Sequence, residues 1–261
     1  MIRFINNMIQ ADKNNARADE LNVKAFNKIA SAEKELEEQK RKTRISIEKL
    51  ANRKRGILST SFVQFLDVYE KMMKINFIEG DGIKELSSLS LSKVTIGQVK
   101  EMVSVASKEP STGQLVTAMI VKGGVSGVIR QESEMNVSEA RIRNSQARVI
   151  ESQAQTNCII LDGIYERAER ISSLLSKLNV MFVKSLMTTR FLIESKGNDR
   201  RNYNQNDRDQ LATCINIATT LKKIIDSPLL NENGELEEQS RVAIEIGNKY
   251  LKDINDTIKR I

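Results

Sequence analysis

The feature that most constrains this chain is a seven-residue repeat of small and apolar side chains in its second half. From Ala147 to Leu192, the first and fourth positions of seven successive heptads keep one register. Such a repeat predicts a long helix that packs along another helix with a left-handed crossing. The first positions are Ala147, Ala154, Leu161, Ala168, Leu175, Phe182 and Thr189, and the fourth positions are Ile150, Asn157, Ile164, Ile171, Leu178, Ser185 and Leu192.

Two of these positions are polar. We expect Asn157 and Ser185 to fix the register of the pairing, because a polar residue in an apolar seam favours one alignment of the helices. The alternative is that they line a polar channel in an assembled form.

A second repeat runs through the first quarter of the chain. It predicts a helix from about residue 12 to about residue 78, bent near Gly56, whose last part (62–78) is apolar enough to be packed on several sides. The recurring residues are Ile29, Leu36, Thr43, Leu50 and Ile57, and a second seam is partly filled by Ala32, Ile47 and Phe65.

The pattern of the C-terminal quarter predicts a helical hairpin. Asp207 is a suitable cap for a helix that Ser227 and Pro228 end, and the turn LLNENG leads to a last helix. The apolar residues of these two helices are Leu211, Cys214, Ala218, Leu221 and Ile225, followed by Leu236, Ala243, Ile246, Tyr250 and Ile254.

These patterns predict an all-α fold: an elongated helical bundle of long coiled-coil-like helices packed antiparallel, with a C-terminal helical hairpin. With 4% aromatic residues, no Trp and two Pro, the composition is poor in residues that sheets and turns favour. We expect four segments within one cooperative elongated domain: a long amphipathic helix (1–79), an irregular, glycine-containing hydrophobic centre (80–131), the heptad helix (132–196) and the hairpin (197–261).

The residue inventory argues against catalysis. The chain has no His, which removes the commonest general base and the commonest metal ligand. Its two cysteines, Cys158 and Cys214, lie far apart in sequence and are expected to be reduced thiols of a cytosolic protein. No phosphate-binding loop or EF-hand spacing is present. We therefore expect no enzyme, no catalytic or metal-binding residues and no cofactor.

The positive charge is concentrated at the start of the chain. The formal net charge is +7, and residues 1–60 hold 14 Lys and Arg against 8 Asp and Glu. These residues form either a solvated helical face or a patch for an anionic surface. We do not expect nucleic acid as a partner, because no aromatic residue lies within the basic runs to stack on bases. The candidate patch consists of Lys40, Arg41, Lys42, Arg44, Arg53, Lys54 and Arg55.

The stretch LVTAMIVKGGVSGVI, from Leu115 to Ile129, has Lys122 as its single charge. It is shorter than the roughly 20 apolar residues that span a bilayer, yet Gly123 and Gly127 form a G-x-x-x-G pair that allows close helix approach. Three interpretations stay open: a bend or small-residue contact in a bundle, a segment that meets a membrane, or a loop. The candidate membrane or assembly residues are Leu115, Val116, Met119, Ile120, Val121, Gly123, Gly124, Gly127 and Ile129.

Together, the charged N-terminal block ending in SFVQFLDVYEKM, the glycine-containing centre and the hairpin from NDRDQLATC onward resemble a bacterial family. Its members carry coiled-coil flanks around a glycine-rich, membrane-associated middle, although the centre here is shorter and contains Lys122. The layout is also similar in architecture to helical pore-forming toxins. The resemblance implies a protein that acts by assembly at a membrane.

We therefore expect a non-enzymatic bacterial helical protein that acts by assembly and is associated with, or active on, membranes. The alternative is a coiled-coil adaptor or scaffold that does not contact lipid. Its predicted partners are further copies or another protein, bound through the coiled-coil helices, and an anionic membrane surface. The N-terminus lacks a signal peptide and no segment is a clear transmembrane helix, so we expect a cytoplasmic protein that can lie at the periphery of the inner membrane.

Overall fold

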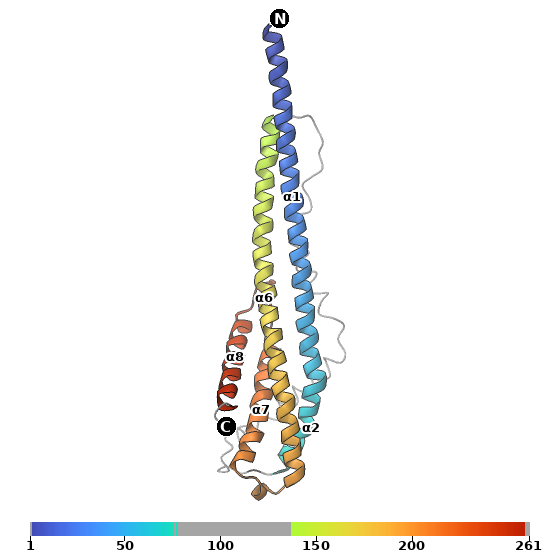
Figure 1. Cartoon of the computed structure of the whole chain (residues 1–261). Helices are drawn as coiled ribbons and strands as arrows, with labels where there is room; N and C mark the ends of the chain where they lie inside the picture. Colours follow the sequence, from blue (N-terminus) through green and yellow to red (C-terminus); the bar gives the residue numbers. More distant parts are fainter. Residues whose placement is uncertain (1, 76, 78–136, 259–261) are drawn as a thin grey trace. The chain divides into compact units, whose positions relative to one another are not determined.

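The computed structural model describes residues 2–75, 77 and 137–258, and these residues are helical except at short connections. The predicted all-α class is confirmed. The helices are α1 (Ile2–Ile57), α2 (Val63–Met72), α6 (Val137–Lys196), α7 (Gln205–Asp226) and α8 (Glu238–Ile258), labelled in Figure 1. A π-helical turn (Leu58–Phe62) separates α1 from α2, and short 3-10 turns cover Met73–Ile75 and Arg200–Asn202.

The described residues form two compact units. Unit 1 holds residues 2–45 and 137–165, and unit 2 holds residues 46–75, 77 and 166–258. Helices α1 and α6 contribute to both units, so each unit combines segments that are far apart in sequence.

Unit 1 is a pair of helices with a seam of small side chains. Thr43, from α1, is fully buried, and its hydroxyl donates a hydrogen bond of 3.0 Å to the carbonyl of Leu161 on α6. The other buried seam residues come from both helices at heptad spacing. They are Ala18, Ala25, Ala32 and Leu36 from α1, and Ala140, Ala147, Ala154, Leu161 and Ile164 from α6.

The helices of unit 1 are parallel, which corrects the prediction of antiparallel packing. Lys28 donates to Glu151 over 2.8 Å and Gln39 donates to Asp162 over 3.2 Å, and each pair is separated by 123 residues. A constant difference in residue number means that the two helices run in the same direction, because antiparallel helices would keep the sum constant instead. The heptad pattern had fixed the buried face but carries no information on direction.

Unit 2 repeats this parallel relation between its own segments. Ser46 donates to Glu169 over 2.9 Å, and Arg190 donates to Asp67 over 3.3 Å, again with 123 residues between partners. Helices α1 and α6 also run in the same direction in the ribbon of Figure 1.

The π-helical turn shifts the buried face of the first helical segment by one residue. Up to Ile57, the seam follows the predicted heptads, since Leu36, Thr43, Leu50 and Ile57 are buried. From the first residue of the turn onward, the buried series with the same period is Leu58, Phe65 and Met72. A π-helical turn inserts one residue into an α-helix, which accounts for this shift. The hydroxyl of Thr60 donates to the carbonyl of Gly56 over 2.7 Å, so the departure from α-helix begins beside the glycine at which we predicted a bend.

The shifted face brings aromatic rings into the core of unit 2. The ring of Phe182, on α6, lies 5.4 Å from that of Phe62 and 5.6 Å from that of Phe65. All three rings are buried, with Phe62 and Phe182 almost completely so. This cluster joins α2 to α6, and buried Leu and Ile side chains from α6 and α7 extend it.

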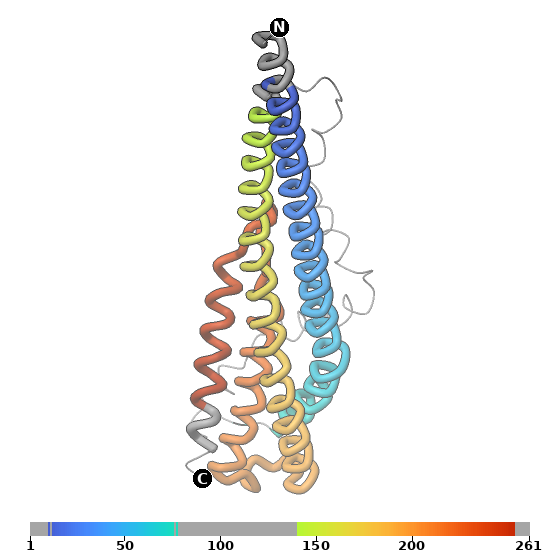
Figure 2. The backbone as a smooth tube through the Cα atoms, turned by 45° about the horizontal axis from the view of Figure 1, so that its top comes forward, coloured from blue at the N-terminus to red at the C-terminus, as the bar shows by residue number. Residues whose placement is uncertain are grey.

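Helices α7 and α8 form the predicted antiparallel hairpin, visible in Figure 1 and Figure 2. Leu230 and Leu236 form a β-bridge within the connection, where Gly234 has a positive φ of 81°. At Gly247 in α8, an added Cβ would lie 2.5 Å from a methyl carbon of Leu174 on α6. The glycine therefore allows α8 to pack closely on α6.

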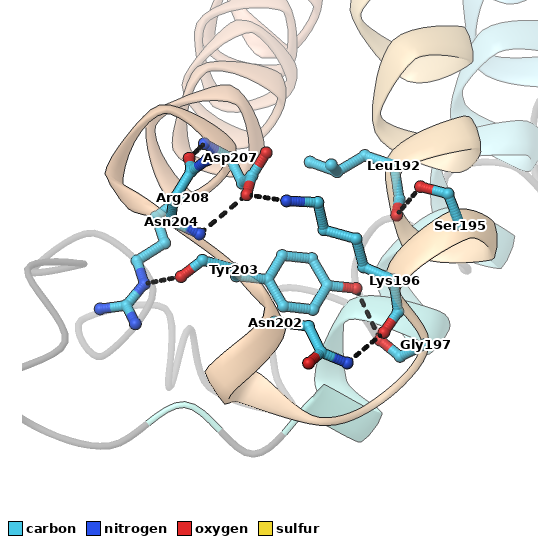
Figure 3. A network of polar contacts seen from close by, with 9 residues as sticks. All are labelled: Leu192, Ser195, Lys196, Gly197, Asn202, Tyr203, Asn204, Asp207 and Arg208. Carbon is cyan, nitrogen blue, oxygen red and sulfur yellow. Dashed lines mark hydrogen bonds and ion pairs between the residues drawn. The ribbon is translucent and has the colours of Figure 1, made fainter.

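The corner between α6 and α7 is held by a polar network, shown in Figure 3. Asn204, and not Asp207, caps α7. Its side chain accepts from the Asp207 backbone N–H, and the Asp207 carboxylate accepts from the Asn204 N–H over 2.8 Å. Lys196, at the end of α6, forms an ion pair with Asp207. The hydroxyl of Tyr203 donates to the carbonyl of Gly197 over 2.7 Å, which closes the corner.

Phe77 packs against this corner. Its ring lies edge-on to Tyr203 with 5.6 Å between ring centroids, and the guanidinium carbon of Arg208 lies 6.0 Å from the Phe77 ring centroid. The described residues that follow α2 are thus attached to the α6–α7 corner within unit 2.

Candidate functional site

Most of the residues that the heptad repeat of α6 predicted to face another helix are buried. All seven first positions, from Ala147 to Thr189, are buried. Among the fourth positions Ile164, Ile171, Leu178 and Ser185 are buried, whereas Ile150, Asn157 and Leu192 are half-buried. Ser185 accepts a hydrogen bond of 3.1 Å from the amide of Gln210 on α7, so its polar group is satisfied within the core of unit 2.

The predicted membrane or assembly segment, Leu115 to Ile129, lies outside the described residues. Its nine candidate residues therefore stay a prediction. Among the described residues, none of the helices combines the length and apolar character needed to cross a bilayer.

The first half of the predicted anionic-surface patch lies in unit 1. Lys40 is 2.8 Å from Glu37, and Lys42 is 3.1 Å from Glu38, so two of its four basic residues are paired on the same helix. Arg41 and Arg44 are exposed. The positive charge of this half is thus partly neutralised by neighbouring glutamates.

The second half of the patch, in unit 2, is differently arranged. The ammonium of Lys54 donates to the carbonyls of Ile225 and Ser227, both at 2.9 Å, at the C-terminal end of α7. Burial lowers the pKa of Lys54 to about 8, and the nearby Asp226 charge opposes this shift. Lys54 therefore holds α1 to α7 and is not available to an external anion. Arg53 is half-buried beside Glu169, and Arg55 lies 3.4 Å from the Asn52 side chain.

The two thiols are not activated. Burial raises the pKa of Cys158, and it raises that of the fully buried Cys214 to about 11. A cysteine nucleophile or metal ligand needs the thiolate, which these environments disfavour. In the part of the chain that the structure describes, no group of three or more Cys, Asp and Glu side chains could hold a metal ion.

Unit 1 carries a second stripe of apolar side chains that the sequence analysis missed. On α6, Ile142, Val149 and Ile160 are more than half exposed, and they lie at spacings of seven and eleven residues. They start two residues after Ala140 of the buried seam. Because two residues turn a helix by about 200°, this stripe points away from the seam. The signal was present in the sequence as a further seven-residue repeat offset from the first.

Helix α1 adds exposed apolar residues to the same unit. Phe26 is 70% exposed and Val23 is 59% exposed, although the neighbouring Ala25 is buried in the seam. On the helical wheel, Phe26 lies about 100° from Ala25, on the opposite flank of the seam from the polar contact of Lys28. Val23, two residues before Ala25, points away from α6, whereas the stripe on α6 points away from α1, so the two sets lie on different sides of the pair. We call Ile142, Val149 and Ile160, all on α6, the outer stripe of unit 1.

Unit 2 has a separate exposed row on α6. Val180, Met187 and Phe191 are 70%, 64% and 73% exposed and follow one another at spacings of seven and four residues. A helix places residues with these spacings on one face. We call these three residues the α6 row.

The fold and these surfaces define a class: an all-α protein of two helical units, each with apolar side chains on its outside. The chain matches no protein-family model, no curated protein and no solved structure. The resemblances to a bacterial membrane-associated family and to helical pore-forming toxins therefore stay predictions.

Proposed function

We propose that the protein is a non-enzymatic helical assembly protein in which the outer stripe of unit 1 packs against the same stripe of a further copy. The observation that supports this proposal is that unit 1 exposes more large apolar side chains than it buries. Among the side chains that the structure describes in unit 1, the buried apolar residues larger than alanine are Leu36, Leu161 and Ile164. Seven large apolar side chains of the same described set are exposed, namely Val23, Phe26, Ile45, Ile142, Val149, Ile159 and Ile160.

The energies support association. An alanine methyl in the seam contributes about 0.8 kcal/mol on burial, whereas a fully buried Phe or Ile contributes about 1.5 to 3 kcal/mol. Burial of the exposed Phe, Ile and Val side chains of unit 1 would therefore contribute more free energy than burial of its seam alanines does. A bundle of four helices, formed by two copies of the pair, would bury the stripe at knobs-into-holes spacing.

The chemistry of the described residues fits a role in assembly. The described cysteines have raised pKa values, the sequence has no His, and the strongly shifted lysine is bound to backbone carbonyls. These features support a protein that acts through its helical surfaces.

Two neighbouring isoleucines provide a matched test. Ile160 belongs to the outer stripe, whereas Ile159, which is more exposed, lies about 100° away on the helix. Sedimentation velocity of the full chain over a range of concentrations should show association that Ile160→Lys weakens at least tenfold. The Ile159→Lys control should associate like the unmodified chain. A chain that stays monomeric up to high micromolar concentration, or equal effects of the two substitutions, would contradict the proposal.

Membrane association is a second candidate, and the apolar sequence from Leu115 to Ile129 favours it. The segment holds a single charge, Lys122, and a small-residue pair suited to close helix contacts. Flotation with vesicles containing anionic lipid tests it. Replacement of Gly123 and Gly127 by Leu should then reduce dye release without reducing helical content. An unmodified chain that neither floats with vesicles nor releases dye would leave the lipid-free scaffold as the function.

A further inference from the structure

The α6 row of unit 2 is a narrow apolar surface in a basic setting. Its three side chains extend from Val180 to Phe191, about 16 Å along the helix at 1.5 Å per residue. Between Glu169 and Glu194, α6 contains no acidic residue and four basic ones. The basic residues in this span are Arg170, Lys177, Lys184 and Arg190.

Two of these basic residues have no acidic partner among the residues that the structure describes. Arg170 pairs with Glu166 and Arg190 pairs with Asp67. Lys177 and Lys184 are exposed, and no described carboxylate lies within ion-pair distance of either. Lys184 lies four residues after Val180 and three before Met187, so its charge projects from the same side of the helix as the row. Lys177 lies three residues before Val180 and extends this positive border.

The chemistry of the row selects one kind of occupant. Apolar side chains at spacings of seven and four residues match the anchors of an amphipathic helix, and the two free lysines favour acidic residues beside those anchors. A second copy of the row would bring lysine against lysine. A lipid surface would gain about 1 kcal/mol from each lysine, which is little support for three apolar side chains on a straight helix.

We propose that the α6 row, with Lys177 and Lys184, binds an acidic amphipathic helix of a partner protein. The partner helix needs about three turns, with apolar residues on one face and Asp or Glu at their flanks. This surface differs in position and chemistry from the outer stripe of unit 1, so the proposal does not depend on self-association through that stripe.

A synthetic peptide can serve as the probe. We would use a labelled 21-residue peptide with Leu at the first and fourth positions of three heptads and mainly Glu elsewhere, and a second peptide with Lys in place of Glu. In fluorescence anisotropy with the full chain, the acidic peptide should bind at least tenfold more tightly than the basic one. Its affinity should fall as salt is added, because exposed charges are screened.

Variants locate the site. Lys177→Glu with Lys184→Glu should weaken binding of the acidic peptide at least tenfold, and Met187→Ser with Phe191→Ser should do the same. The matched control is Lys223→Glu with Lys249→Glu, which reverses two exposed lysines of α7 and α8 and should leave the affinity unchanged. All of these positions are exposed, and circular dichroism should show unchanged helical content in every variant.

Three results would overturn the proposal. The first is equal binding of the acidic and basic peptides, or equal effects of the two lysine double variants. The second is loss of self-association in the Met187→Ser, Phe191→Ser variant without peptide binding by the parent chain, which would make the row a contact between copies. The third is binding to vesicles of phosphatidylcholine and phosphatidylglycerol that this variant abolishes, again without peptide binding, which would make it a lipid contact.

Discussion

Units 1 and 2 use the same parallel pairing of two segments but differ in what fills the space between them. Unit 1 relies on a seam of alanines, with Leu36, Leu161 and Ile164 as its larger buried residues. Unit 2 adds α7, α8 and an aromatic cluster, and its core contains many Leu, Ile, Phe and Met side chains. The difference teaches that one heptad pattern can serve two purposes. In unit 2 it contributes large side chains to a core shared with α7, and in unit 1 it holds two helices together while apolar side chains stay exposed on their outer sides.

The largest effect should come from the core of unit 2. Leu175 is fully buried, and Leu175→Ala should lower the free energy of unfolding by about 2 to 5 kcal/mol through lost burial and a residual cavity. Urea denaturation followed by circular dichroism measures this change. Val180→Ala, on the same helix but exposed, should change it by less than about 0.5 kcal/mol.

Leu161→Ala provides the contrast from unit 1. Because its buried cluster holds only Ala32, Leu36 and Ala154 besides Leu161 itself, and its side chain is slightly exposed, the loss should lie at or below the lower end of that range. A cost equal to that of Leu175→Ala would show that the two seams are equally well packed and would remove the difference between the units.

Two glycines test how closely the added helices of unit 2 are packed. A side chain at Gly247 would meet methyl groups of Leu174 and Ile224 at 2.5 Å and 2.9 Å. Gly247→Leu should therefore cost about 1 to 3 kcal/mol through overpacking. Gly56 has no neighbouring atom within 4 Å of an added Cβ, so Gly56→Ala should stabilise α1 by about 0.5 to 1 kcal/mol. Thermal melts compare the two, and a neutral Gly247→Leu would mean that α8 is not held against α6.

Features of the fold that depend on residues close together in the sequence could be predicted, whereas those that depend on contacts between distant residues could not. The buried first positions of the heptads followed from spacing alone, because one helix face repeats every seven residues. Helix direction did not follow, since a seam of Ala and Leu packs in either direction. The one-residue shift at Leu58–Phe62 was also not predicted, because a π-helical turn has no strong sequence signal. Its one trace in the sequence is that Phe65 does not continue the repeat of the first seam.

The candidate sites show the same limit. Lys54 looked like one member of a basic surface, but its carbonyl partners lie 171 and 173 residues away in sequence. Its burial is a property of the tertiary structure. The outer stripe of unit 1 was accessible in principle, because Ile142, Val149 and Thr156 repeat every seven residues. We assigned a single seam to α6, and a helix in a larger assembly can carry two.

Lys54 gives unit 2 a pH-dependent stability between pH 8 and pH 9. Its folded-state pKa of about 8 is below the ordinary value of 10.5, so above pH 8 the unfolded chain binds more protons at this residue than the folded chain. The Lys54 contribution to stability therefore increases with pH, by about 1 kcal/mol between pH 8 and pH 9. Above pH 9 the raised pKa of Cys214 acts in the opposite direction.

Lys54→Met isolates this effect. Urea denaturation at pH 8 and pH 9 should show a stability increase in the parent chain that is smaller by about 1 kcal/mol in the variant. The Lys223→Met control replaces an exposed lysine of α7 and should keep the parent dependence. Equal pH dependence in all three proteins would mean that the Lys54 ammonium is solvated in the folded state.

The smallest expected effect tests the parallel register that the units have in common. Lys28 and Glu151 form an ion pair of 2.8 Å in unit 1, and both side chains are about one-third exposed. A double-mutant cycle to alanine should give a coupling of about 0.2 to 1 kcal/mol, as for other exposed pairs. The mismatched cycle of Lys28 with Asp162 should give none, because Asp162 accepts from Gln39 eleven residues further along α1.

Since so small a coupling can vanish in salt, cross-linking provides a second test of the same register. With Cys158 and Cys214 replaced by Ser, a short bismaleimide should join Lys28→Cys to Glu151→Cys within one chain and should not join Lys28→Cys to Asp162→Cys. The reverse result would show that α1 and α6 pair in another register, and the outer stripe of unit 1 would then have to be redrawn.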